Sequence, residues 1–440
     1  PCAILFVILY SKLLNVFSRE KVFYIVVSFF TLFFGLFATV IYPHLQTVHP
    51  DPEAIAATVE FVGSLKWGGL PIGQFFVPFI KIWGMWSYAA FYVLAELWGS
   101  SMIALLFWQF ANQITRTEEA KRFYPMFGLM ANLAPILAGM ATSYFSNVKE
   151  SLPEGIDPWG YTLNWLMGIV VACGIIIMAI YRWMQTNVLT DKRYYDESEM
   201  LNQPKKKKEK LSVWESFKLI ATSRYLGLIT ILVLAYGVSI NLIELVWKNQ
   251  VRLLFPDKNQ YNEFMGRLFI ATGITTMILI MFFKGIVAKF GWLKGAILTP
   301  IVTVITGGLF FAFILFQDSV DPLVVLTGAS ALALSVWFGT AQNVLAKGVK
   351  YSLFDPTKEM TYIPLDEELK TKGKAAVDVI GGRLGKASGG YIASALLPFF
   401  LGDVLAATPV FFGIVVVIVA LWIISVFALN RDYQKKLAEK

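Results

Sequence analysis

Long apolar stretches dominate this chain and set its expected fold. A helix needs roughly 20 mainly apolar residues to cross the hydrocarbon core of a bilayer. Segments of this kind lie near residues 1–11, 22–42, 79–110, 124–145, 161–186, 225–247, 264–284, 295–316, 322–345, 377–400 and 407–429. In lipid each crossing segment must satisfy its own backbone hydrogen bonds, which helices do and open sheets do not. The pattern predicts an all-α polytopic membrane protein.

The apolar stretches form two groups on either side of a polar segment. Five precede the lysine-rich stretch Gln185–Ser223, and six follow it. The first begins at residue 1 in mid-stretch, which indicates that a leading helix is missing from this chain. We therefore expect two halves of six helices with 11 of 12 visible: an N-terminal half at 1–186, a basic linker at 187–223 and a C-terminal half at 224–440.

Composition and charge fit this arrangement and give it an orientation. The chain is 57% hydrophobic and only 15% charged, whereas soluble domains are about one quarter charged. Cytoplasmic loops of membrane proteins are rich in lysine and arginine. If the linker is cytoplasmic, about 29 of the 38 basic residues fall on that side. We expect the linker and the C-terminus inside, and we attribute the net charge of +8 to topology rather than to nucleic-acid binding.

Several kinds of chemistry are poorly supported by the sequence. Cys2 and Cys173 lie in separate apolar stretches, where cysteine is usually a small packing residue. His44 and His49 share one proline-rich loop, and the chain has no other histidine to complete a zinc or hydrolytic site. No phosphate-binding GxxxxGK[ST] loop occurs. We therefore expect neither an enzyme nor a bound cofactor or metal.

Ionisable residues inside apolar stretches are the informative exceptions, because burying a charge in a bilayer is costly. Glu96 lies in YAAFYVLAELWGS and is either a packing acid bonded to a neighbouring helix or a carboxylate that couples transport. Glu244 lies between Asn241 and Lys248, each about one turn away. Lys248 at i+4 shares its helix face, so it either pairs with Glu244 or extends to the membrane surface.

A third cluster lies where a polar loop turns into an apolar helix. Lys374, Asp378, Arg383 and Lys386 follow one another there, the last two well beyond the expected membrane surface. Arginine can grip phosphate oxygens with two donors, and lysine adds a point charge, so the cluster suits a polyanion. Glycines in this region permit close helix packing or local unwinding. They are Gly381, Gly382, Gly385, Gly389 and Gly390.

Several sequence runs resemble one family closely. FYVLAELWGS, FANQIT, EAKRFYPMFGLMAN, YGVSINLIELVWK, KYSLFDPTKEMTYIPLD and KGKAAVDV occur in order across both halves. They are similar to the nucleotide transporters of the ATP:ADP antiporter family, known from intracellular bacteria and plastid envelopes. The resemblance implies a twelve-helix carrier like the major facilitators that exchanges ATP for ADP, with or without phosphate, by alternating access. It also implies a monomer in a bacterial inner membrane or a plastid inner envelope.

The resemblance also assigns roles to single residues. The family's charged positions fall on Glu96 in AELWG, on Glu244 in NLIE and on Lys374 in KGKAA. We hypothesise a central cavity in which Lys374, Arg383 and Lys386 hold the phosphates. Leu245, Val246 and Arg267 depart from the pattern of the ATP/ADP exchangers. Proton-coupled uptake of a broader set of nucleotides therefore stays open as an alternative, and a facilitator for another solute is a more distant one.

Overall fold

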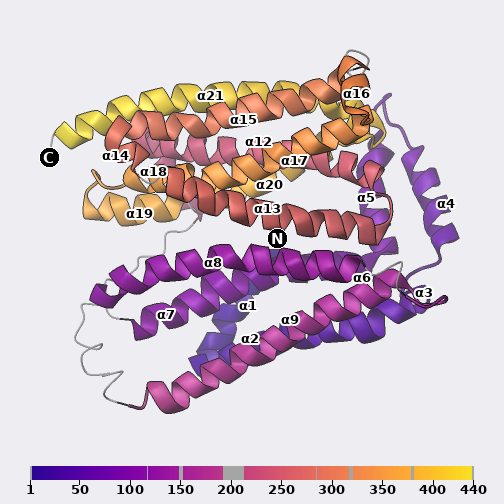
Figure 1. The fold of residues 1–440 in the computed structure, drawn as a ribbon, viewed down its shortest axis with the longest axis horizontal. Coiled ribbons are helices and arrows are strands. Elements are labelled where there is room, and N and C mark those ends of the chain that lie inside the picture. The colour runs from indigo at the N-terminus through magenta and orange to yellow at the C-terminus, as the bar shows by residue number, and fades with distance from the viewer. Residues whose placement is uncertain are drawn as a thin grey trace. The chain divides into compact units, whose positions relative to one another are not determined.

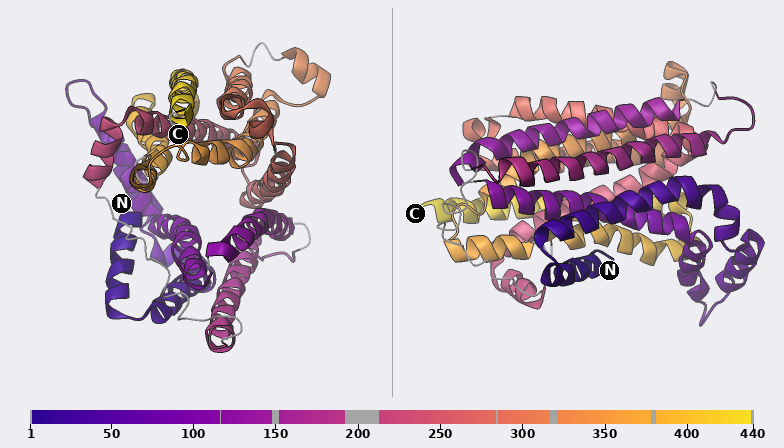
Figure 2. Two further views of the ribbon diagram at one scale, coloured as in Figure 1. Left: turned by 90° about the vertical axis from the view of Figure 1, so that its left-hand side faces the viewer. Right: turned by 90° about the horizontal axis from the view of Figure 1, so that it is seen from below.

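The computed structural model describes residues 2–115, 117–147, 152–191, 213–283, 285–316, 321–377 and 381–438. Across these ranges every extended regular element is a helix, and the one β-bridge joins Trp67 to Leu70. The predicted all-α class is therefore confirmed. The chain divides into two compact units, the first from Pro1–Met130 and Tyr144–Lys206, the second from Ala131–Ser143 and Lys207–Lys440. Within each unit the long helices run side by side (Figures 1 and 2).

The first unit contains the N-terminal helices. In chain order they are α1 (Cys2–Val16), α2 (Arg19–Leu36), η1 (Phe37–Ile41), η2 (Tyr42–His44), α3 (Leu45–Val48), α4 (Pro52–Gly63), α5 (Ile72–Gly84), α6 (Trp86–Gly99), η3 (Ser100–Phe107), α7 (Trp108–Ile114), α8 (Thr117–Ser146), α9 (Pro158–Trp183) and η5 (Met184–Val188). Residues 131–143 of α8 belong to the second unit.

The second unit contains the remaining helices. They are α11 (Val213–Thr222), α12 (Arg224–Leu254), α13 (Lys258–Phe283), α14 (Ile286–Phe290), α15 (Trp292–Leu315), α16 (Asp321–Thr327), α17 (Ala331–Val349), η7 (Lys350–Phe354), α18 (Asp355–Met360), α19 (Glu367–Val377), α20 (Arg383–Leu396), η9 (Leu397–Phe400) and α21 (Val404–Ala438).

Seven helical segments of the described chain are long and apolar enough to cross a membrane. They are Arg19–Val48, Trp86–Ile114, Pro158–Val188, Arg224–Leu254, Lys258–Phe283, Trp292–Leu315 and Val404–Ala438. The protein is therefore a multi-pass membrane protein. The stretches predicted near 1–11, 124–145, 322–345 and 377–400 are not among the seven; three of them are helical where they are described, and the one at 322–345 is helical except at residues 328–330. The count of twelve helices remains a prediction.

Two of the expected apolar stretches are interrupted. The stretch at 79–110 is broken at Met85, whose φ of −128° and ψ of 40° are not helical, so α5 ends at Gly84 and the span begins at Trp86. The stretch at 322–345 is broken after α16, where Gly328 has a φ of 67° and Ser330 caps α17. Hydropathy averages over such short breaks, which depend on single backbone angles.

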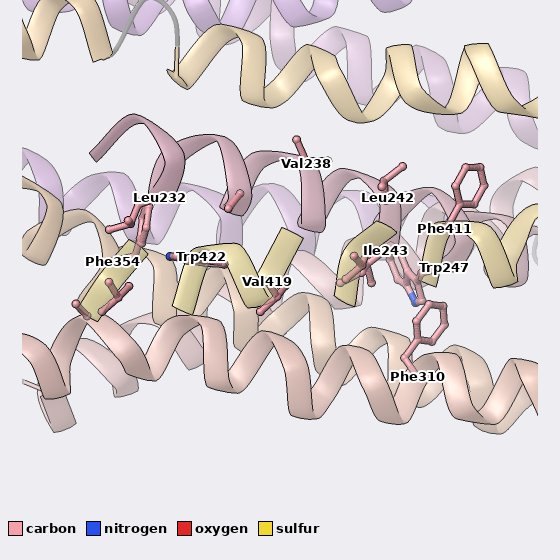
Figure 3. Packing of buried hydrophobic residues seen from close by; sticks show 14 of the residues in the cluster. Leu232, Val238, Leu242, Ile243, Trp247, Phe310, Phe354, Phe411, Val419 and Trp422 are labelled. Atoms are coloured by element: carbon pink, nitrogen blue, oxygen red, sulfur yellow. The ribbon is translucent and has the colours of Figure 1, made fainter. Parts of the chain in front are cut away.

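Helix α12 forms the centre of the second unit. It contacts α17, α20 and α21, and its side chains include the fully buried Leu242, Ile243 and Trp247. Figure 3 shows these residues with Phe310 of α15 and Trp422 of α21. The indole N–H of Trp247 donates to the Val336 carbonyl at 3.2 Å, so its polar atom is satisfied in the core. The unit is thus built around one helix, which also carries Asn241, Glu244 and Lys248.

Two long helices continue into a π-helical stretch close to a charged residue. In the first unit η3 follows Glu96 of α6, and in the second η7 follows α17. Pro356 is the second residue of α18, which follows η7 directly. Proline has no N–H, and in a helix its ring crowds the carbonyl of the residue four positions earlier. For Pro356 that residue is Ser352 in η7, and the wider π turn gives its carbonyl room. Such turns occur frequently at functional sites.

Candidate functional site

Glu244 lies at the centre of a charged cluster in the second unit. Its Oε1 is 3.3 Å from Nζ of Lys248 on the same helix and 3.6 Å from Nζ of Lys347 on α17. The pair with Lys248 is the one that the i, i+4 spacing predicted. Lys347 is a second partner that the sequence interpretation did not include. Lys347 is also less exposed than Lys248, at 27% against 48% of its side chain.

This cluster carries a net positive charge. One carboxylate (−1) and two ammonium groups (+2) sum to +1 for Glu244, Lys248 and Lys347. The two lysines share one carboxylate, so one positive charge remains unbalanced, and neighbouring atoms screen a half-buried charge less than water does. The arrangement therefore favours an anionic ligand beside the two lysines.

A second basic group lies one turn further along the same helix. Lys350, the first residue of η7, is three residues after Lys347, a rise of about 4.5 Å in a regular helix. Its Nζ donates to Asp355 Oδ2 at 2.7 Å. The same ammonium lies 4.2 Å from the ring centroid of Tyr351 and 5.9 Å from that of Tyr236 on α12. Both aromatic faces favour a cation there.

Lys374 lies in α19 and is paired on the protein surface. Its Nζ donates to Glu359 Oε2 at 2.6 Å, and Lys358 Nζ is 3.3 Å from Glu359 Oε1. The side chains of Lys374 and Glu359 are 46% and 44% exposed. Burial alone would raise the pKa of Glu359, but the hydrogen bond and charge of Lys374, together with Lys358, lower that pKa below its usual value.

The glycines of α20 pack against α12. A Cβ at Gly389 would lie 2.4 Å from Cβ of Asn241, and one at Gly237 would lie 2.6 Å from the carbonyl carbon of Gly385. A Cβ at Gly381 would also contact α12, 3.2 Å from Val233. Close packing against α12 is thus the role of Gly385 and Gly389 in α20 and of Gly381 just before it. Asn241 lies in this contact and donates to the Gly237 carbonyl at 2.7 Å.

Two neighbouring glycines have open space beside them instead. A Cβ at Gly382, directly before α20, or at Gly390 would meet no atom within 4 Å. Arg383 and Lys386 belong to the same helix, but their side chains lie outside the described residues, as does Asp378 altogether. The predicted contacts of these cations with phosphate therefore remain predictions.

Glu96 is located in α6 of the first unit, four residues before η3 begins. Its neighbours Ala95 and Trp98 pack against the core around Phe30 and Phe34 of α2, whereas Glu96 itself is exposed. Among the described residues its carboxylate has no hydrogen-bond or ion-pair partner. Among the described residues Glu96 therefore makes no internal bond of the kind that a packing acid would make.

Comparison with known proteins identifies the family of this chain. The sequence pattern of the TLC ATP/ADP transporter family matches residues 1–433. The chain belongs to this family. It is 44% identical over 441 residues to ADP,ATP carrier protein 1 of Chlamydia pneumoniae, covering all of this chain and 83% of that protein. It is 47% identical over 439 residues to ADP,ATP carrier protein 1 of Rickettsia bellii, covering 99% and 84%.

A plant protein and a solved structure are also similar to this TLC family member. ADP,ATP carrier protein 1, chloroplastic, of Arabidopsis thaliana is 40% identical over 440 residues, covering all of this chain and 67% of that protein. The crystal structure of a bacterial homologue of the iron transporter ferroportin in an inward-facing state has a TM-score of 0.40 and 14% identity. It covers 90% of this chain and 89% of that one.

Lys347, Lys350 and Glu359 are the charged residues that the sequence interpretation missed in this family member. All three lie in or beside the run KYSLFDPTKEMTYIPLD, which was used only as a family signature. The apolar stretch predicted at 322–345 ended before these residues. Instead α17 continues to Val349 and is followed directly by η7, which places both lysines on a helix. The spacing of three residues between Lys347 and Lys350, which is close to one helical turn, was the sequence signal that could have placed them on a helix.

Proposed function

We propose that this chain exchanges ATP for ADP across a membrane by alternating access. The observation that carries the proposal is the similarity along the whole chain, at 40 to 47% identity, to proteins named ADP,ATP carrier. Its location is a bacterial inner membrane or a plastid inner envelope, with the linker and C-terminus on the inner side. The carrier acts as a monomer and is not an enzyme, and phosphate accompanies one of the nucleotides.

The substrate requires compensation for its charge inside the membrane. Each phosphate carries on the order of one to two negative charges at neutral pH, so ATP and ADP cannot cross hydrocarbon unaided. Lys248 and Lys347 contribute cations beside Glu244 in the second unit. In the proposed mechanism the phosphates take these lysines from Glu244, and Glu244 takes them back when the site is empty. Binding thus exchanges an internal ion pair for a substrate contact.

The remaining predicted residues have complementary roles in this proposal. Lys374, Arg383 and Lys386 bind phosphate oxygens, and Lys374 leaves Glu359 to do so. Asn241 keeps α20 close to α12 and thereby positions Glu244. Glu96 couples the opposite unit to substrate binding, because a carboxylate without a protein partner responds to the charge of an approaching polyanion.

A second candidate, proton-coupled uptake of several nucleotides, is favoured by the unpartnered Glu96. Glu96 lies in an apolar span and has no protein partner among the described residues, so its carboxylate is available as a proton carrier. Protonated Glu96 would then accompany the nucleotide inward. In this alternative the carrier does not need a counter-substrate on the opposite side.

One experiment separates these candidates. Purified carrier in liposomes preloaded with ADP, with ATP or with buffer alone is supplied with labelled ATP, with and without a proton gradient. Exchange predicts uptake only into the nucleotide-loaded vesicles, independent of the gradient. Uptake into buffer-loaded vesicles that follows the gradient would establish the proton-coupled alternative. Competition by sugars but not by ATP would reject both and indicate a facilitator for another solute.

A further inference from the structure

A helical hairpin, α4–α5, projects from the first unit between two spans. It begins at Pro52, four residues after the span Arg19–Val48, and ends at Gly84, two residues before the span Trp86–Ile114. In Figures 1 and 2 both hairpin helices run across the direction of the long helices, and in Figure 1 α4 lies farther from them than α5 does. The Trp86 indole donates to the Val48 carbonyl at 3.1 Å and joins the two span ends.

One face of α5 is covered by α4. A Cβ at Gly73 would clash with the Val62 carbonyl, and one at Gly84 would lie 2.9 Å from Ile55. Val77 is buried on the same face, and Gln74 donates to the Gly63 carbonyl at 3.0 Å. The two helices of the hairpin are therefore packed closely against each other, and this contact uses one apolar side of α5.

A second apolar side of α5 has no protein covering among the described residues. Phe76, Phe79 and Trp83 recur at spacings of three and four residues, which places them on one helix face. They are exposed, Phe79 to 69% and Trp83 to 64%. We call these three residues the α5 stripe. Monomeric soluble surfaces rarely expose such a continuous apolar patch unless it binds something.

The tip of the hairpin extends this surface. Trp67 and Leu70 exchange two backbone hydrogen bonds of 3.1 and 3.0 Å across a tight turn. The turn consists of Gly68 and Gly69, whose φ values of 57° and 83° are conformations that residues with a Cβ rarely adopt. Trp67 directly precedes this turn, and 78% of its surface is exposed.

We propose that the α4–α5 hairpin lies on the membrane surface and inserts the α5 stripe and Trp67 into the lipid interface. Tryptophan is enriched at the depth of the lipid headgroups. An amphipathic helix in this position buries its apolar face about 5–10 Å into the boundary between headgroups and acyl chains. The hairpin starts and ends within four residues of two spans, so it is already at that depth. Asp51, Glu53 and Glu60 lie on or beside α4, the helix farther from the spans, and remain in water.

Site-specific fluorescence tests this placement on the full carrier. In a background in which Cys2 and Cys173 are replaced by serine, an environment-sensitive dye is attached at Phe79→Cys or Trp67→Cys, with Glu60→Cys on α4 as the matched control. The protein is reconstituted in phosphatidylethanolamine–phosphatidylglycerol vesicles. We expect blue-shifted emission at positions 79 and 67, quenching by lipids spin-labelled high on the acyl chain, and loss of iodide quenching. At position 60 we expect emission without a blue shift, no quenching by the spin-labelled lipids, and quenching by iodide.

Two outcomes would overturn the proposal. Iodide quenching at positions 79 and 67 equal to that at position 60 would place the stripe and the tip in water. Protection from iodide without quenching by the labelled lipids would mean that a protein, such as a second copy of this chain, covers the stripe. Trp83→Cys provides an independent label on the stripe if Phe79→Cys disturbs folding, and the gel-filtration profile of each variant reports its folding independently of nucleotide transport.

Discussion

A single carboxylate, Glu244, organises the charges of the second unit. Its bond to Lys248 was predictable because both residues share one helix face, and helix geometry alone fixes their distance. Its bond to Lys347 was not, because that contact depends on how α17 packs against α12. The same difference applies to Lys374. Its charge was evident from the sequence, but its partner Glu359 became evident only with the fold.

Replacing Lys347 by glutamine is expected to weaken nucleotide binding. Hydrogen bonds to charged groups contribute about 1.5–3 kcal/mol, so the apparent KM for ATP should rise roughly 10- to 100-fold. Labelled uptake into ADP-loaded proteoliposomes measures this change. Lys289→Gln, an exposed lysine of α14 in the same unit, is the matched control and should leave the KM unaltered. A normal KM in the Lys347 variant would show that this lysine only neutralises Glu244.

At the scale of elements, α12 packs closely against α20 and the residues just before it. Gly381, Gly385 and Gly389 recur at intervals of four residues and all meet α12. Their spacing in the sequence was sufficient to predict close packing but did not identify the partner helix. The breaks at Met85 and Gly328 are the opposite case. The apolar pattern continues through both, and only the backbone angles reveal where each helix ends.

Two neighbouring glycines of α20 should respond in opposite ways to alanine. At Gly389 the added methyl group would overlap Asn241, so we expect a loss of about 1–3 kcal/mol of stability from overpacking. At Gly390 the methyl group enters open space, and the higher helix propensity of alanine should give no loss and a gain of up to about 1 kcal/mol. Thermal unfolding of the two variants in the same detergent measures the difference. Equal melting temperatures would contradict the close contact.

At the scale of the whole molecule, sequence alone was enough for the fold class and the family. Apolar length and low charge predicted an all-helical membrane protein, because the bilayer imposes the same length on every crossing helix. Motifs spread over the chain indicated the transporter family. What could not be predicted was the α4–α5 hairpin, because its apolar residues resemble the beginning of a span. The predicted stretch at 79–110 includes the C-terminal end of α5 for this reason.

The distribution of basic residues predicts which loops face the cytoplasm. In a cysteine-free background, Glu154→Cys lies in the loop before α9, which we expect outside, and Lys435→Cys lies near the end of α21, which we expect inside. In intact cells a membrane-impermeant maleimide should label position 154 and leave position 435 unlabelled until the membrane is opened. Labelling in the reverse order would invert the topology and with it the assignment of the linker.

The glycine contacts between α12 and α20 also restrict how this carrier can move. Backbones that approach this closely at three successive turns cannot slide past each other without collisions, so we expect α12 and α20 to move together. Glu244 belongs to α12, whereas Lys347 belongs to α17, which also packs against α12. In the proposed transport cycle, any shift of the α12–α20 pair relative to α17 would change the distance between these two charges.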